Sequence, residues 1–147
     1  MRELPRQLSE DELAELFEGR TRLVELLAQR ENPLETADDV IRDLSDEDKL
    51  AALDAHPAIG AKAATLSDRS RREQGEEHDP AAETELAYLN QVYEEKFGFR
   101  FVVFVNRRPK SAIVPILQER VARTREVELE TALHELVAIA RDRWQTA

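Results

Sequence analysis

The sequence contains no cysteine, which excludes several classes of site at once. Without thiols there is no disulfide scaffold, no thiolate nucleophile and no cysteine-ligated zinc or iron–sulfur centre. Glycine and proline are also scarce, with 4 and 6 residues, and aromatic residues make up 5% of the chain. So few turn-forming and strand-favouring residues argue against an all-β sandwich or barrel.

Basic residues are in the minority, with 21 lysines and arginines against 31 aspartates and glutamates and a net charge of -10. Such a chain repels nucleic-acid phosphates, so we expect no nucleic-acid partner. Long apolar runs are missing as well, which predicts no membrane span and no signal peptide, and therefore a soluble cytoplasmic protein. The 147 residues suffice for one folded domain, 1–147.

Apolar residues recur at helical spacing along nearly the whole chain. A capping box at Ser9 and Glu12 opens the first helical pattern. Further helices are expected up to Asn32-Pro33, from Thr36, from Ser45 to about His56, over about 80–97 with Gly98 as its C-cap, from Ser111, and over about 125–144. The predicted fold is an all-α, single-domain bundle of roughly seven or eight short helices.

Residues 99–105 form the one strand-like run, and no second run of similar character exists to pair with it. A single strand cannot form a sheet. The run is therefore expected to be a buried extended connector, or else an edge used in self-association. The second possibility favours a homodimer.

His56 stands out among the three histidines because it opens the segment His56-Pro57-Ala58-Ile59-Gly60. Pro57 restricts the backbone and Gly60 permits a tight turn, so the imidazole is held on an irregular segment. That location suits acid/base chemistry near neutral pH, and it equally suits a histidine that merely closes a helix. His78 and His134 receive no role, and no spacing of histidines and carboxylates predicts a metal site.

Ser70, Glu73 and Gln74 lie at helical i, i+3 and i+4 positions in a very polar segment. A hydroxyl, a carboxylate and an amide on one face can bind a nitrogen-rich heterocycle. Taken alone, the segment is better explained as a solvated helix with Ser70 as its N-cap and Glu73 as the capping partner.

Taken together and in order, three segments resemble the OHCU decarboxylase family: HPAIG at 56–60, SRREQ at 70–74 and LNQVYEEKFGFRFVVFV at 89–105. These enzymes decarboxylate 2-oxo-4-hydroxy-4-carboxy-5-ureidoimidazoline (OHCU) in uric acid degradation. Two later patterns also match, namely Ile113, Leu117 and Arg120, followed by Glu135, Ile139 and Arg143. The resemblance spans nearly the whole chain. It implies an all-α fold, (S)-allantoin as product, no cofactor and no metal, and it favours a homodimer.

The resemblance also implies roles for individual residues. His56 looks like the family's acid/base histidine, and Glu73 looks like its catalytic carboxylate partner. Arg143 looks like the arginine that holds a carboxylate or ureido oxygen, with Arg141 as the alternative register. By position alone, Arg143 is a charge at the end of the last helix, where it is favourable with the helix dipole. The further substrate contacts implied are Pro57, Ser70, Gln74, Phe101, Val102 and Val103, the last three through backbone amides and an apolar side chain.

Two other functions fit the sequence. The chain can be an acidic all-α interaction module without catalysis, with the polar segment 61–79 as its partner surface. It can also be a family relative that acts on another ureido or imidazole compound, since a change of one substrate group needs only one or two pocket changes. An enzyme should bring His56, Glu73 and Arg143 into one pocket, whereas an interaction module should leave them scattered.

Overall fold

The computed structural model describes residues 2–58 and 79–146, and every regular element in this part of the chain is an α-helix. The predicted all-α class and the expected number of helices are therefore confirmed. The seven described helices are α1 (Glu10–Phe17), α2 (Arg22–Leu27), α3 (Ala37–Arg42), α4 (Asp46–Asp54), α6 (Pro80–Phe97), α7 (Lys110–Val121) and α8 (Arg125–Thr146).

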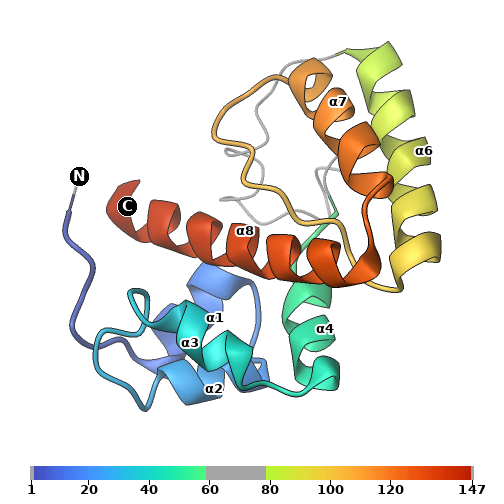
Figure 1. The fold of residues 1–147 in the computed structure, drawn as a ribbon. Coiled ribbons are helices and arrows are strands. Elements are labelled where there is room, and N and C mark those ends of the chain that lie inside the picture. The colour runs from blue at the N-terminus through green and yellow to red at the C-terminus, as the bar shows by residue number, and fades with distance from the viewer. Residues whose placement is uncertain (1, 59–78, 147) are drawn as a thin grey trace.

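The long C-terminal helix α8 lies between two groups of shorter helices (Figure 1). Helices α1, α3 and α4 contact α8 directly, and α2 packs against α1, α3 and α4. Helices α6 and α7 pack against each other and lie beyond the other side of α8. The buried positions on α8 include Ala132, Leu133, Leu136, Val137, Ile139 and Ala140, so this helix supplies much of the core.

Helix boundaries follow the capping residues at several of the expected places. At α1 the Glu12 amide donates to Ser9 Oγ at 3.1 Å, and Glu12 Oε1 accepts from the Ser9 amide at 3.0 Å, which confirms the capping box. Ser45 caps α4 in the same way by accepting from the Asp48 amide. Gly98 ends α6 in the left-handed region, with φ 79°, where a residue without Cβ is favoured.

Two predicted boundaries are wrong, and a third differs by two residues. Helix α2 ends at Leu27 and not at Asn32-Pro33, because the next amides bond to carbonyls three residues back and turn the chain. Ser111 does not cap α7; Pro109 is the N-cap residue, and its carbonyl accepts from Ala112 at 2.9 Å. Helix α8 continues to Thr146, past the expected end at Trp144.

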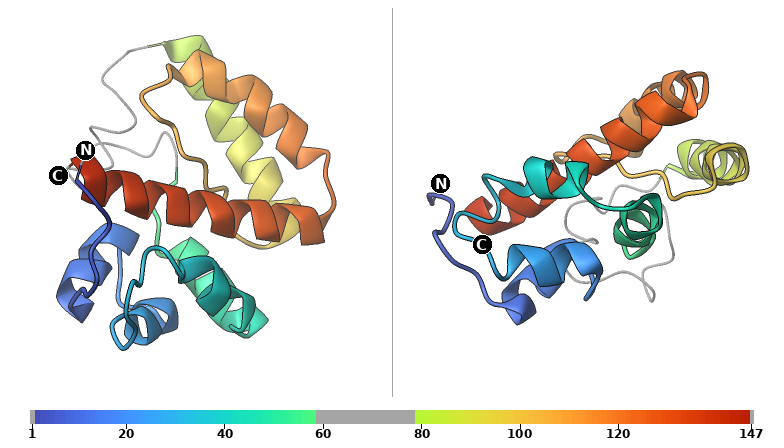
Figure 2. Two further views of the ribbon diagram at one scale, coloured as in Figure 1. Left: turned by 60° about the vertical axis from the view of Figure 1, so that its left-hand side comes forward. Right: turned by 60° about the horizontal axis from the view of Figure 1, so that its bottom comes forward.

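Helices α6 and α7 run in the same direction, so the chain must return along the length of α6 before α7 begins (Figures 1 and 2). The 18 residues of α6 are about 27 Å long, and only an extended segment covers that distance in few residues. Residues 99–105 make this return without joining any strand among the described residues. Their side chains are buried except for Arg100 and Phe104, which are half-buried. The buried connector is thus confirmed, and the alternative of an edge for self-association is wrong.

The aromatic residues of α6 and the connector form one cluster. The Tyr93 ring lies 4.7 Å from Phe97, 5.8 Å from Phe99 and 5.2 Å from Phe101, measured between centroids. Tilted and edge-on pairs at these distances add to the stability gained from burial alone. Half of the eight aromatic residues of the chain thereby hold the connector against α6.

The two ends of the described chain lie close together (Figures 1 and 2). The Arg2 guanidinium lies 3.7 Å from the centroid of the Trp144 ring, and Trp144 Nε1 donates to the Glu3 carbonyl at 2.8 Å. No described helix has the length and the apolar character needed to cross a membrane.

Candidate active site

His56 lies just beyond α4 and is almost completely buried. The helix ends at Asp54, and the His56 amide still bonds to the Leu53 carbonyl at 3.1 Å. The residue is 5% exposed, and its Nε2 has no hydrogen-bond partner among the residues that the structure describes. A buried polar atom without a partner is rare in folded proteins and is a common feature of reactive sites. The half-buried Pro57 follows directly.

Three charged side chains act on this imidazole. Burial is the largest cause of a lowered pKa at His56; together with the charges of Arg143 and Arg100, and against the opposing charge of Glu18, it lowers the pKa from 6.5 to about 3. The imidazole is therefore neutral at physiological pH, with one ring nitrogen able to accept a proton. The neutral imidazole has a free lone pair, but its lowered pKa means that it binds a proton weakly until a negative charge beside it raises that pKa.

Arg143 is not a surface charge at the end of α8, so the interpretation from its position alone is wrong. Its side chain is 3% exposed. Nη1 donates to the Leu16 carbonyl at 3.0 Å and lies 3.1 Å from Glu18 Oε1. Both partners belong to the end of α1, where Glu18 adopts a left-handed backbone conformation with φ 66°. The last turn of α1 thus fixes Arg143 near His56.

Arg100 holds the connector against the chain at His56. Its Nη1 donates to the His56 carbonyl, its Nε donates to Glu94 at 3.0 Å, and its amide donates to Asp54 Oδ1 at 3.2 Å. The start of the connector therefore lies against the end of α4. Phe101, Val102 and Val103 follow immediately, all buried. Within the described chain, none of these three residues donates a backbone hydrogen bond.

The structure thus brings together His56, Arg143 and the start of the connector that holds Phe101, Val102 and Val103. Ser70, Glu73 and Gln74 lie outside the described residues, so their predicted roles stay predictions. Arg141 is held elsewhere.

Arg141 and His134 occupy a different face of α8. Arg141 Nε donates to the Leu34 carbonyl at 2.8 Å, and Nη2 lies 3.6 Å from Asp38 Oδ2. The exposed His134 lies 3.9 Å from the other oxygen of Asp38. Arg141 therefore has a structural role in holding the turn before α3, and His134 is exposed on the surface of α8, away from the candidate site.

Sequence reasoning missed Glu18 and Arg100. Arg100 had a detectable signal, since it is the one charged residue inside the apolar run 99–105. Glu18 had none, because its partner Arg143 is more than a hundred residues away in the chain.

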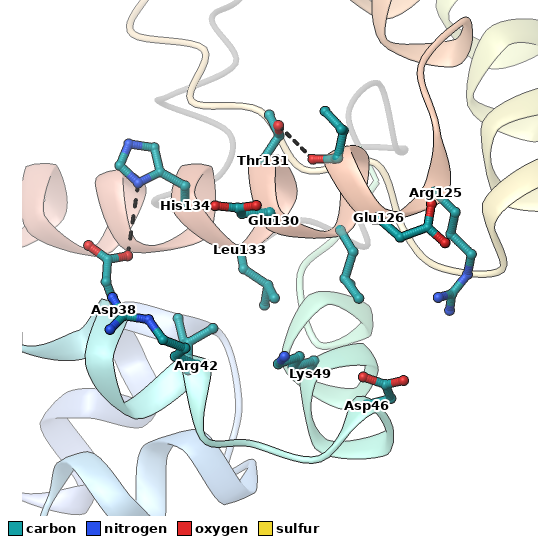
Figure 3. A pocket seen from close by; sticks show the side chains of 13 residues that line it. Asp38, Arg42, Asp46, Lys49, Arg125, Glu126, Glu130, Thr131, Leu133 and His134 are labelled. Carbon is teal, nitrogen blue, oxygen red and sulfur yellow. Dashed lines mark hydrogen bonds and ion pairs between the residues drawn. The ribbon is translucent and has the colours of Figure 1, made fainter.

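A groove elsewhere on the molecule does not include the residues of this site. It lies between α3, α4 and the first half of α8, and Figure 3 shows side chains of both charge signs around it. Asp38, Arg42, Lys49 and Glu130 contribute charges, and no residue predicted to act on a substrate lines it. The described part of the chain also contains no cluster of three or more histidines and carboxylates able to hold a metal ion.

Acidification should destabilise the folded protein through His56. Because the pKa of His56 is held at about 3 in the folded state against 6.5 ordinarily, the unfolded chain binds this proton first as the pH falls. The free energy of unfolding should decrease below pH 6.5 by up to about 1.4 kcal/mol per pH unit from this group. Urea denaturation between pH 7 and pH 4 measures the slope.

His56→Gln should make that slope shallower, and His134→Gln is the matched control on the exposed face of α8. An unchanged slope in His56→Gln would contradict the buried neutral state.

Comparisons with known proteins agree with the resemblance found in the sequence. The sequence model of the family described as OHCU decarboxylase matches residues 2–145. The 2-oxo-4-hydroxy-4-carboxy-5-ureidoimidazoline decarboxylase of Halalkalicoccus jeotgali is 34% identical over 68% of this chain, and that of Haloferax volcanii is 35% identical over 68%. These matches span 58% and 61% of the two relatives, less than two thirds of either.

A solved structure is similar over almost the whole fold. The crystal structure of OHCU decarboxylase in the presence of (S)-allantoin superposes with a TM-score of 0.75 and 25% identity, covering 90% of this chain and 94% of that one. The match of the family to nearly every residue, on an all-α fold of the same shape, leads to one conclusion: this chain belongs to the OHCU decarboxylase family.

Proposed function

We propose that this protein is a carboxy-lyase that decarboxylates OHCU to (S)-allantoin. The observation that carries the proposal is the buried, neutral imidazole of His56 beside Arg143, in a chain of this family. Burial and the two arginines hold this histidine in its neutral form, which can accept a proton. The solved structure named for OHCU decarboxylase and (S)-allantoin supports the choice of reaction.

The reaction needs a base and an electron acceptor. When the bond from carbon 4 to the carboxylate breaks and CO2 leaves, its electron pair forms a C4=C5 double bond while the C5=N π electrons move to the ring nitrogen, which takes a proton from solvent. His56 takes the proton of the 4-hydroxyl as the carbonyl of the product forms. A proton then adds to carbon 5 from one face, which sets the configuration of the allantoin. The ring itself accepts the electrons, so we propose no metal and no cofactor.

The charges around His56 suit an anionic substrate. Arg143 and Arg100 place positive charge close to the imidazole. A planar guanidinium matches a carboxylate or ureido oxygen, which is the role we propose for Arg143. Glu18 holds Arg143 from the side of α1. We propose Glu73 as the partner of His56, Ser70 and Gln74 as ring and ureido ligands, and Pro57 as a wall beside the imidazole.

Residues 101–103 are proposed to bind the flat ring. Their amides donate to no described residue, and Phe101, Val102 and Val103 are buried directly beyond Arg100. A backbone amide binds a ring carbonyl oxygen without side-chain rearrangement, which suits a site that must hold a substrate in one orientation.

We further propose that residues 1–147 act as one domain in a cytoplasmic homodimer. The family resemblance alone supports the homodimer, because the apolar connector is buried within the chain and offers no surface for pairing.

A family relative that uses another ureido or imidazole compound is the second candidate. The direct test is to mix the protein with freshly prepared OHCU, made from urate with uricase and hydroxyisourate hydrolase, and to follow circular dichroism. We expect (S)-allantoin to form faster than in buffer and to the same extent with EDTA present. No acceleration over buffer would reject the decarboxylase proposal, and loss with EDTA that zinc restores would reject the cofactor-free mechanism.

Removing either member of the proposed acid/base pair should slow turnover strongly. We expect His56→Ala and Glu73→Ala each to lower kcat by at least about a hundredfold, the usual scale for a general acid/base group. Stopped-flow circular dichroism gives the rate, and a thermal melt of each variant tests folding. A large loss of melting temperature with proportionate loss of activity would point to a structural role instead.

Arg143 and Arg141 provide a matched pair of substitutions on one helix. Arg143→Lys keeps the charge but loses the planar fork, so kcat/KM for OHCU should fall severalfold or more. Arg141→Lys loses bonds to the turn before α3 and should lower the melting temperature while leaving kcat/KM unchanged. The reverse pattern of kcat/KM would move the substrate contact to Arg141.

A further inference from the structure

A buried ion pair joins α6, α7 and α8 behind the connector. Arg120 Nε donates to Glu128 Oε1 at 2.8 Å, and the Tyr93 hydroxyl donates to the same oxygen at 2.7 Å. Arg120 is 3% exposed and Glu128 is fully buried. Burial and the bond to Glu128 raise the pKa of Tyr93, so the phenol stays protonated and remains a donor.

Stability alone does not explain why these charges are buried. Removing two charges from water has a large desolvation penalty, and buried ion pairs are often replaced by apolar residues of similar volume without loss of stability. Arg120 Nη2 also lacks a hydrogen-bond partner within the described structure, and Glu128 Oε2 makes no hydrogen bond there but lies 3.5 Å from Arg123 Nη1, so the desolvation penalty is only partly offset. The cluster therefore needs another reason, and the remaining contact of Arg120 supplies one.

Arg120 holds the connector at one peptide. Its Nη1 donates to the Val102 carbonyl at 2.7 Å, and its guanidinium lies 4.6 Å from the centroid of the Phe101 ring. The peptide between Val102 and Val103 is trans, as are all described peptides, so its carbonyl and its amide point in opposite directions. With the carbonyl bound to Arg120, the Val103 amide must face away from the ion pair.

No described residue accepts a hydrogen bond from the Val103 amide. A buried amide requires a partner, and Arg100, three residues earlier in the same connector, bonds to the His56 carbonyl of the candidate site. The bond from Arg120 is the described hydrogen bond made to this peptide itself, which belongs to no helix or sheet; the next amide, that of Phe104, donates to Glu135 Oε1 at 3.3 Å.

We propose that Arg120, held by Glu128 and Tyr93, is a positioning residue that orients the Val102–Val103 peptide so that the Val103 amide donates to a carbonyl oxygen of the substrate ring. The proposal rests on the proposed decarboxylase function and on the predicted contact of residues 101–103. Arg120 itself does not touch the substrate; it acts through the peptide plane.

The test replaces the polar cluster by apolar groups of similar size, as Tyr93→Phe/Arg120→Met/Glu128→Leu. We expect this triple variant to fold, with a melting temperature close to that of the parent, and to lose about tenfold in kcat/KM for OHCU, the equivalent of one directed hydrogen bond. In ¹⁵N-labelled protein, added (S)-allantoin should shift the Val103 amide resonance in the parent and not in the triple variant.

Arg125→Met is the matched control. Arg125 also holds a carbonyl, that of Phe97 at 3.1 Å, and lies over the Phe99 ring at 5.5 Å, but it lies outside residues 101–103. We expect it to lower the melting temperature and to leave kcat/KM unchanged.

If the triple variant does not fold, Arg120→Lys tests the positioning role instead. A single ammonium group keeps the charge beside Glu128 but cannot also reproduce the second donor at Val102, so kcat/KM should again fall.

Parent-like kcat/KM in either folded variant overturns the positioning role while leaving the decarboxylase function intact. A parent protein inactive on OHCU rejects the proposed function, and the inference about Arg120 falls with it.

Discussion

The fold depends on arginine side chains that bind backbone carbonyls which no helix or sheet satisfies. Buried carbonyls need partners, and this chain buries irregular backbone at helix ends and along the connector. A guanidinium reaches several acceptors at once because it carries five donors in a rigid plane, and the chain has 17 arginines and only 4 lysines. The carbonyls bound in this way include those of Leu16, Leu34, His56, Phe97, Val102 and Val105.

The arginine–carbonyl bonds that hold the fold together also affect the chemistry at His56. Burial is the main reason that the His56 imidazole is neutral, and Arg143 and Arg100, which each satisfy a carbonyl, add to that effect through their positive charges. A lysine at either position would supply charge but not the same set of bonds. Stability and reactivity are therefore not separable at these residues, and Glu18 limits the excess positive charge by pairing with Arg143.

Local patterns predicted most of the fold, because helix periodicity and caps such as Ser9, Ser45 and Gly98 act over three or four residues. The burial of Arg143 was not predictable in this way, since its partner Leu16 lies 127 residues away. The burial of Glu128 was detectable in the sequence. Glu128 lies four residues before Ala132 and eight before Leu136, on the same apolar face of α8, and a carboxylate on an apolar helix face indicates a buried charge. The segment 56–60 and the family resemblance together point to His56 as a site residue. Its neutral state depends on tertiary burial, which no local pattern encodes.

Trp144 gives the protein an optical property that follows from its position. It is the only tryptophan in the chain, it is next to Arg143, and Arg2 and Glu3 cover its ring and its indole nitrogen. The emission of an indole moves to longer wavelength when water reaches it. The fluorescence of Trp144 therefore reports, without an added label, whether the first residues of the chain are packed against the end of α8. This contact lies one residue from Arg143, the arginine near His56.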